Sequence, residues 1–242
     1  MTRGTALVTG ADHGLGLALT QRLLERGWTV IAGRYLQAEH RLDELAETFT
    51  DHSLTIVNID ISDQSSVARA AEETRATHPV IDLVINNAAI LGNTGLENRI
   101  ADGLDYASIL ETLSVNALGA LRVVESFLPA ISPSALRRLC FVSSEAGSVT
   151  RSHRRSWFGY AMSKCALNMG VSILFNDLRP DGFTFRLYHP GWMRTLMRGT
   201  EDRDALLTPT EAADRALHYF LDAEVDEDRL VMRDYEGKDW PW

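Results

Sequence analysis

Cysteine is scarce in this chain, whose 242 residues include only Cys140 and Cys165. Both lie inside apolar segments, and neither belongs to a Cys-x-x-Cys motif or to a Cys/His pair at metal-ligand spacing. His189 and His218 also lack a partner at such spacing. Disulfide frameworks and metal sites depend on these spacings. We therefore expect free, buried thiols and no metal site.

Long apolar runs are absent as well. The chain has no uninterrupted run of 18 apolar residues, no low-complexity linker and no internal repeat, whereas a membrane-crossing helix needs about 20 mostly apolar residues. The N-terminus leads directly into the strand-like stretch Thr5-Ala6-Leu7-Val8, with no recognisable secretory leader. We expect one domain over residues 1–242, no membrane span and a cytoplasmic location.

Positively charged residues are fewer than negatively charged ones. The sequence has 24 Lys and Arg against 33 Asp and Glu, for a formal net charge of -9. Nucleic acids and anionic membrane surfaces select for clustered positive charge, so neither is expected as the main partner. A small-molecule substrate fits this balance better. Hydrophobic residues make up 45% of the chain, which is enough to cover both faces of a sheet.

Short apolar runs alternate with helical patterns along the whole chain. The predicted strands lie near 5–9, 28–33, 54–59, 82–86, 139–143, 183–189 and 229–233, and the predicted helices near 15–26, 37–48, 64–77, 105–130, 157–179 and 209–222. Strands such as Leu83-Val84-Ile85 lack in/out alternation, which is typical of a parallel sheet with helices on both faces. The pattern predicts an α/β, doubly wound fold with a parallel seven-stranded sheet.

A glycine-rich turn connects the first predicted strand to the first predicted helix. It reads Thr9-Gly10-Ala11-Asp12-His13-Gly14-Leu15-Gly16. Glycines at this spacing allow a tight turn and a close approach of the backbone to a pyrophosphate, whose charge is met by amides at the helix N-terminus. We interpret the turn as a dinucleotide phosphate site. The alternative is an ordinary glycine-rich connection.

Arg34 ends the second predicted strand, where an NAD-binding protein usually carries an acidic residue for the adenosine ribose. A guanidinium can bind a 2′-phosphate through two hydrogen bonds, whereas a carboxylate would repel it. His13 could add a further contact. The sequence therefore favours NADP(H), with NAD(H) as a possible cofactor. The alternative is that Arg34 is a solvated loop cation.

Tyr160 and Lys164 lie four residues apart, so on a helix both side chains occupy one face. An ammonium beside a phenol favours the phenolate, so we expect the pKa of Tyr160 to be lowered and the phenol to act as acid or base. The pair is not diagnostic alone. Asn116 and Ser143-Ser144 precede it in the order that a nicotinamide-dependent oxidoreductase requires.

Taken together, these motifs resemble those of the short-chain dehydrogenase/reductase family over almost the whole chain, and within it the C-factor and sniffer-type carbonyl reductase branch. The family is indicated by residues 9–16, Asp60, Asn86-Asn87-Ala88, Asn116, Ser144, Tyr160 with Lys164, and Pro190-Gly191 with Thr195. The branch is indicated by residues 143–149 and 163–168, by His189-Pro190-Gly191-Trp192, and by Asp234-Tyr235-Glu236-Gly237 with Pro241-Trp242. The resemblance implies a single-domain Rossmann fold.

The resemblance also implies a role for each motif residue. Tyr160 would exchange the proton, Lys164 would lower its pKa and bind the nicotinamide ribose, Ser144 would hold the substrate oxygen, and Asn116 would position a water. The implied cofactor contacts come from Gly10, Asp12, His13, Gly14, Leu15, Gly16, Arg34, Asp60, Ile61, Asn87, Ala88, Tyr160, Lys164, Pro190, Gly191, Met193 and Thr195, with Asn86 also lining the cleft.

Several positions leave alternatives open. Ala89 replaces the usual glycine, and Ser143 and Ser148 are weaker candidates than Ser144 for the catalytic serine. Asn116 lies in an apolar helix, where a buried structural asparagine is common. His153-Arg154-Arg155 could meet an anionic substrate or lie in a solvated loop. Residues 190–208, with Leu196, Met197, Leu206 and Leu207, form either a mobile substrate lid or a segment packed on the sheet.

Two functions from different classes fit the sequence. The first is an enzyme that interconverts a carbonyl and an alcohol with NADP(H), and the second is a C-factor-like signalling protein that binds a dinucleotide. An extended nucleotide-sugar epimerase fits less well, because its glycine turn differs. The resemblance also implies a homodimer or homotetramer formed by the helices near 105–130 and 157–179, with Leu118, Leu121, Val124, Phe127, Leu167, Val171, Leu174 and Phe175 as candidates. Burial of these residues within the monomer is the alternative.

Overall fold

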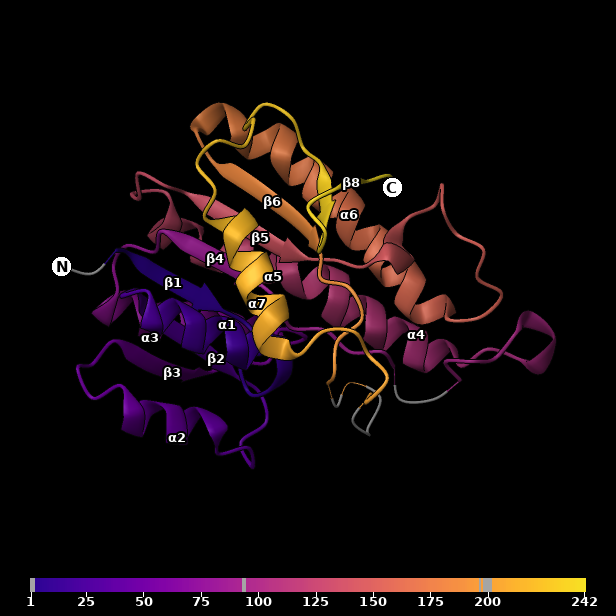
Figure 1. The fold of residues 1–242 in the computed structure, drawn as a ribbon, viewed down its shortest axis with the longest axis horizontal. Coiled ribbons are helices and arrows are strands. Elements are labelled where there is room, and N and C mark those ends of the chain that lie inside the picture. Colours follow the sequence, from indigo (N-terminus) through magenta and orange to yellow (C-terminus); the bar gives the residue numbers. More distant parts are fainter. Residues whose placement is uncertain (1–2, 93–94, 196, 198–201) are drawn as a thin grey trace.

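The computed structural model describes residues 3–92, 95–195, 197 and 202–242. Its centre is one sheet with the strand order β3-β2-β1-β4-β5-β6-β7-β8 (Figure 1). The strands are β1 (Thr5–Val8), β2 (Thr29–Arg34), β3 (Leu54–Asn58), β4 (Leu83–Asn86), β5 (Arg138–Val142), β6 (Thr184–His189), β7 (Met232–Asp234) and β8 (Asp239–Trp240). β1 to β7 pair in parallel, and β8 runs antiparallel to β7.

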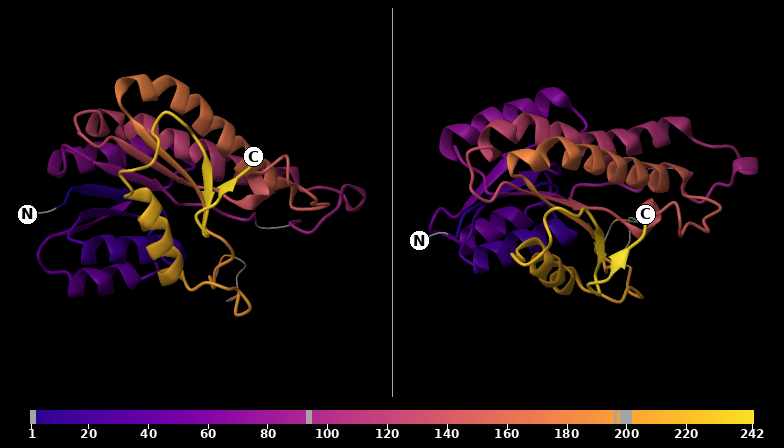
Figure 2. Two further views of the ribbon diagram at one scale, coloured as in Figure 1. Left: turned by 45° about the horizontal axis from the view of Figure 1, so that its top comes forward. Right: turned by 90° about the horizontal axis from the view of Figure 1, so that it is seen from above.

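Helices cover both faces of the sheet (Figure 2). They are α1 (Gly14–Glu25), α2 (Arg41–Thr48), α3 (Gln64–Thr77), α4 (Tyr106–Leu113), α5 (Gly119–Ile131), α6 (Phe158–Leu178) and α7 (Pro209–Phe220). Buried side chains of α1, α2 and α7 form the core on one face, and those of α3, α5 and α6 form the core on the other. The predicted doubly wound fold is confirmed.

The strand count differs from the prediction, which gave seven strands, whereas the described residues form a sheet of eight. β8 contains only Asp239–Trp240, and it folds back on β7. The predicted strand at 229–233 lies a few residues too early, because β7 spans Met232–Asp234. Asp239 and Trp240 are too few residues to show the alternation of apolar and polar side chains from which a strand could be predicted.

The predicted helix near 105–130 consists of three helical pieces. A π-helical segment, η2 (Ser114–Leu118), joins α4 to α5. By length and mean hydropathy of 1.3, Tyr106–Ile131 could cross a membrane, but 44% of its apolar window is buried inside the protein. Core helices of α/β domains share this composition.

The edge of the sheet at the carboxyl ends of β1, β4, β5 and β6 collects the polar motifs. Thr9 follows β1, Asn87 follows β4, Ser143 follows β5 and His189 ends β6. The strand order reverses between β1 and β4, and ligands of doubly wound folds bind at such a switch point. We therefore expect the ligand-binding site at this edge of the sheet.

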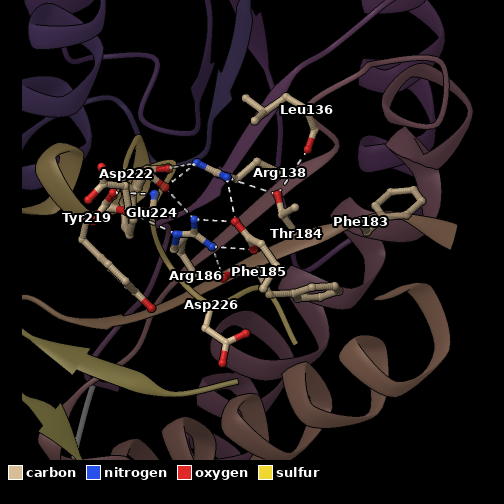
Figure 3. Close-up of polar contacts among 12 residues, drawn as sticks. Leu136, Arg138, Phe183, Thr184, Phe185, Arg186, Tyr219, Asp222, Glu224 and Asp226 are labelled. Carbon is tan, nitrogen blue, oxygen red and sulfur yellow. Dashed lines mark hydrogen bonds and ion pairs between the residues drawn. The ribbon is translucent and has the colours of Figure 1, made fainter. Parts of the chain in front are cut away.

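Charged side chains from β5, from β6 and from the segment after α7 form a largely buried cluster (Figure 3). Arg186 is fully buried and donates to both carboxylate oxygens of Glu227, at 2.8 and 2.7 Å. Arg138 donates to the same carboxylate at 3.0 Å and to the carbonyl oxygens of Phe220 and Asp222. These contacts tie the segment after α7 to the sheet, and this segment leads into β7 and β8.

Candidate active site

A cavity of about 930 Å³ opens at the carboxyl edge of the sheet. Its walls come from the turn after β1, the ends of β4, β5 and β6, the first turns of α6, and the segment around β7 and β8. The predicted residues that line it are Gly10, Asp12, His13, Gly14, Leu15, Gly16, Asp60, Ile61, Asn87, Ala88, Ser144, Tyr160, Lys164, Pro190, Gly191, Met193 and Thr195. The structure therefore brings together residues that are far apart in the sequence.

The glycine-rich turn is built for close approach. A Cβ on Gly16 would overlap the carbonyl oxygen of Gly10, so this contact requires glycine. Asn87 Nδ2 donates to the carbonyl oxygens of Thr9 and Gly10, at 3.0 and 3.1 Å. Thr9 Oγ1 accepts from the amides of Asn87 and Ala88 in return. The start of α1 is thereby fixed against the end of β4.

The N-terminus of α1 faces the cavity. Its capping residue, His13, makes no side-chain capping bond, and Gly14, Leu15 and Gly16 of the first turn all line the cavity. First-turn amides of a helix lack partners within the helix and carry partial positive charge, so they suit a phosphate group. These residues fit the pyrophosphate of a dinucleotide.

Two residues predicted to contact the cofactor, Arg34 and Asp12, are bound to other parts of the protein. Arg34 does not line the cavity, and its Nη1 donates to both carboxylate oxygens of Asp43 at 3.0 Å. Asp12 lines the cavity, but its carboxylate accepts from the amides of Tyr35 and Leu36 at 3.1 Å. A carboxylate on α2 therefore holds the guanidinium of Arg34 outside the cavity wall, and the contact of Arg34 with a 2′-phosphate stays a prediction.

The Asn86-Asn87-Ala88 motif divides between two environments. Asn86 is the last residue of β4, is buried, and donates from Nδ2 to the carbonyl oxygen of Cys140 at 3.4 Å. It does not line the cavity, whereas Asn87, Ala88 and Ala89 do. The prediction that Asn86 lines the cleft is therefore wrong, because its position in the strand turns it into the sheet.

Tyr160 and Lys164 occupy one face of α6 and both line the cavity. Lys164 Nζ lies 5.8 Å from the centre of the Tyr160 ring and donates to the carbonyl oxygen of Val142 at 2.9 Å. Burial lowers the pKa of Lys164 to about 8. A lysine with this pKa gives up a proton more readily than a solvated one.

The pKa of Tyr160 moves against the prediction. Burial raises the pKa of the phenol, whereas its hydrogen bond with Ser144 acts in the opposite direction. Lys164 bonds to a backbone carbonyl on β5, so its charge does not overcome the cost of burying a phenolate. The expected lowering is therefore absent from the protein without a cofactor.

Among the three serine candidates, the geometry separates the roles. Ser143 and Ser144 both line the cavity; Ser144 accepts from the amide of Ala146 at 3.1 Å and acts to lower the pKa of Tyr160. Ser143 donates to Asn168 Oδ1 at 2.6 Å, and Ser148 donates to the carbonyl oxygen of Pro241 at 2.5 Å. Ser143 and Ser148 are thus engaged in holding the fold.

Asn116 lies within the π-helical segment η2 and does not line the cavity. Its Nδ2 donates to the carbonyl oxygen of Ile90 and to Ser163 Oγ, at 2.8 and 2.9 Å, and its Oδ1 accepts from the amide of Ile90. Both Nδ2 hydrogens are therefore used, and the side chain joins the loop after β4 to α6. Its role in positioning a water stays a prediction.

Several cavity residues were missed by sequence reasoning. Glu145, Trp157, His189, Tyr235 and Trp240 all line the cavity. Glu145, His189 and Tyr235 stood in motifs used for the resemblance, which was the available signal, whereas Trp157 and Trp240 stood in none of them. Their arrangement gives the cavity aromatic walls.

The loop between Ser144 and Tyr160 contributes one cation to the cavity. Of the three residues His153-Arg154-Arg155, only Arg154 lines it. Its guanidinium pairs with Glu145 and lies 4.6 Å above the centre of the Trp157 ring. The charge is thus partly neutralised, which weakens the expectation that the loop binds an anionic substrate.

A backbone hydrogen bond joins the two ends of the segment at 190–208. Arg194 donates through its amide to the carbonyl oxygen of Leu207 at 2.9 Å, and Leu207 is buried. Leu206 lines the cavity although 72% of its surface is exposed, and Met197 also lines it. Leu196 lies outside the described residues. Whether the segment moves as a lid stays a prediction.

The described residues contain no group of three or more His, Cys, Asp or Glu side chains that could hold a metal ion. Both cysteines are free; Cys140 is buried and Cys165 is half-buried.

Known proteins share this sequence and architecture. The profile of the short chain dehydrogenase family matches residues 4–206. C-signal of Myxococcus xanthus is 40% identical over 174 residues, which cover 72% of this chain and 99% of C-signal. The NADPH-bound carbonyl reductase from chicken fatty liver is 27% identical over the full length of both chains, with a TM-score of 0.86.

The carbonyl reductase Sniffer of D. melanogaster, at 21% identity and full coverage of both chains, shares the fold with a TM-score of 0.87. These similarities agree with the ordered motifs and with the cavity at the switch point. The resemblance predicted from the sequence is confirmed: the chain belongs to the short-chain dehydrogenase/reductase family of oxidoreductases.

Proposed function

We propose that this protein interconverts a carbonyl and an alcohol by hydride transfer with NADP(H). The observation that carries the proposal is that Tyr160, Ser144 and Lys164 line one cavity together with the open N-terminus of α1. A nicotinamide cofactor supplies the hydride when it is bound. The chain itself must then hold the substrate oxygen and move a proton.

The proposed roles follow from the contacts. Tyr160 is buried and protonated, so it can give its phenol proton to a developing alkoxide. Ser144 donates a hydrogen bond to the same oxygen, which stabilises the charge that develops there. Lys164, with its lowered pKa, restores the proton to Tyr160 and helps to hold the cofactor ribose. We propose that Asn116 supports this relay through η2.

NADP(H) remains the proposed cofactor, with NAD(H) possible. Arg34 Nη1 binds Asp43 and its Nε donates to Asn58, but the described residues offer no hydrogen-bond partner to Nη2. That group can reach toward a 2′-phosphate without breaking the ion pair with Asp43. The related chicken carbonyl reductase was solved with NADPH bound.

A signalling role is the second candidate, because this chain is 40% identical to C-signal over nearly all of that protein. A protein that only binds a partner would not need Tyr160 to be reactive. The test is the oxidation of NADPH against a panel of aldehydes and ketones, with Tyr160→Phe as the control. Turnover that disappears in this variant supports the enzyme, and the absence of turnover in both proteins supports the binding protein.

A further inference from the structure

His189 ends β6 and lines the cavity that holds Ser144, Tyr160 and Lys164. Side chains alternate along a strand, and Phe185 and Leu187 belong to the core beneath α5 and α6. His189 follows in the same alternation. It therefore points to the face of the sheet from which α6 presents Tyr160.

The register of β5 and β6 sets how close His189 lies to the catalytic serine. Val142 pairs with Tyr188, and the amide of Ser143 donates to the carbonyl oxygen of Tyr188 at 2.7 Å. His189 thus stands beside Ser143 on a neighbouring strand, about 4.8 Å away in the sheet, and one residue from Ser144. The Glu145 carboxylate raises the pKa of both Tyr160 and His189, so one charge lies near both groups.

The imidazole is held in one orientation. Its ring lies edge-on to Tyr235, with the centres 6.1 Å apart, and 5.5 Å from the ring of Trp240. Gly191 donates from its amide to His189 Nδ1 at 3.5 Å. Burial lowers the pKa of His189 to about 4, against the charges of Glu145 and Asp234. A neutral ring whose Nδ1 accepts carries its proton on Nε2.

This Nε2–H is a donor without a partner. The side chain is 92% buried, with 8% of its surface exposed, yet Nε2 makes no hydrogen bond to any described residue. Unlike the indole nitrogen of Trp240, Nε2 is not fully buried. A donor without a protein partner on a residue that lines a binding cavity favours a ligand that carries an acceptor.

Building on the proposed function, we propose that His189 is a substrate-positioning residue whose Nε2–H donates a hydrogen bond to a second oxygen of the substrate. Ser144 and Tyr160 hold the reacting carbonyl at the same time. The substrate class is then aldehydes or ketones that carry a keto, ether, ester or amide oxygen close to the reacting carbonyl. A ketone with only a hydrocarbon body would displace water from Nε2 and leave the donor unpaired, which penalises its binding.

The test compares benzyloxyacetone with the isosteric ketone in which a methylene replaces the ether oxygen. His189→Phe keeps a ring between Tyr235 and Trp240 but removes the donor, and His189→Gln restores an N–H. The ratio of kcat/KM for the ether ketone to that for its isostere should fall about tenfold in His189→Phe, mainly through KM. In His189→Gln the ratio should return to within about threefold of the unmutated value.

Thermal unfolding and NADPH affinity show whether each variant keeps its fold and cofactor site. An unchanged ratio in a folded His189→Phe overturns the inference, as does a lower KM for the isostere than for the ether ketone in the unmutated protein. The second comparison needs no variant. If the protein reduces neither compound, the inference about His189 is also overturned. The proposed function is then decided separately, by the wider carbonyl panel and by Tyr160→Phe.

Discussion

At the scale of single residues, Tyr160 is subject to opposing influences whose balance sets the pH dependence. Burial raises the pKa of the phenol in the protein without cofactor. Carbonyl reduction uses the protonated phenol, so its rate should persist beyond about pH 10, where a free phenol ionises. Alcohol oxidation needs the phenolate, so its rate should rise toward alkaline pH.

The positive ring of NADP⁺ favours phenolate and should move the ionisation of Tyr160 downward. Ultraviolet titration of the unmutated protein, minus that of Tyr160→Phe, with and without NADP⁺, measures this shift. The same midpoint in both titrations would show that the cofactor does not tune the phenol.

Lys164 should lower the stability of the protein while serving its chemistry. Its side chain is 2% exposed, and burial lowers its pKa from 10.5 to about 8. Between those pH values the unfolded chain binds more protons, so the free energy of unfolding should rise with pH. Lys164→Met should add about 1–3 kcal/mol to the free energy of unfolding at neutral pH and abolish turnover. Urea unfolding measures the first effect, and a decrease in stability would contradict it.

Asp43 should limit the affinity of Arg34 for a 2′-phosphate, since it occupies Nη1 of the guanidinium. Asp43→Asn should tighten NADPH binding several-fold and leave NADH binding little changed. Arg34→Asp should weaken NADPH binding by about 1.5–3 kcal/mol, as expected for a charge-assisted phosphate contact. Calorimetric titration with both cofactors decides this, and equal affinities in the unmutated protein would refute the preference for NADP(H).

At the scale of elements, the cluster of Arg138, Arg186 and Glu227 should anchor the segment between α7 and β7. Glu227→Gln would leave two buried guanidinium groups without their carboxylate, at a cost of about 3–5 kcal/mol. Glu224→Gln, on an exposed neighbour in the same segment, is the matched control. A melting temperature of Glu227→Gln equal to that of the control would show that the cluster contributes no stability.

The elements also show what sequence can and cannot reveal. Helix α3 was predicted at its observed bounds, because Asp63 caps it by accepting from the amide of Ser65 and a periodic apolar stripe follows. The position of the cavity could be predicted, because its motifs follow parallel strands whose carboxyl ends lie at one edge of the sheet. The partner of Arg34 could not be predicted, because Asp43 lies nine residues later on a helix face that the sequence does not orient. The π-helical segment at Asn116 was missed as well; within it, Asn116 bonds to Ser163 of α6, which lies far away in the sequence.

At the scale of the whole molecule, we propose that the protein forms a homodimer or homotetramer through α4, α5 and α6, and that it acts in the cytoplasm. Val124, Phe127, Leu167 and Val171 are buried within the monomer, so their assignment to an interface is corrected. Exposed apolar side chains remain on these helices: Tyr106, Leu110, Leu118, Met162, Met169 and Ile173. Such a surface is typical of an interface between subunits.

Light scattering at micromolar protein should therefore give a mass of two or four chains. Ile173→Asp should shift the mass toward a monomer, because a carboxylate would be buried in the interface. Ile100→Asp is the matched control, since Ile100 is similarly exposed but lies in the short 3-10 helix η1 (Ile100–Asp102) before α4. A monomeric mass for the unmutated protein would exclude this assembly.

The central claim concerns the whole site acting as one unit, and Tyr160→Phe tests it most directly. Single-turnover oxidation of bound NADPH by a carbonyl substrate should slow by at least about a hundredfold in this variant, because the proton donor is lost. The affinity for NADPH, measured in parallel by fluorescence, should stay within about twofold, because the pyrophosphate site at α1 is untouched. Near-normal turnover in Tyr160→Phe with a genuine substrate would contradict the catalytic assignment.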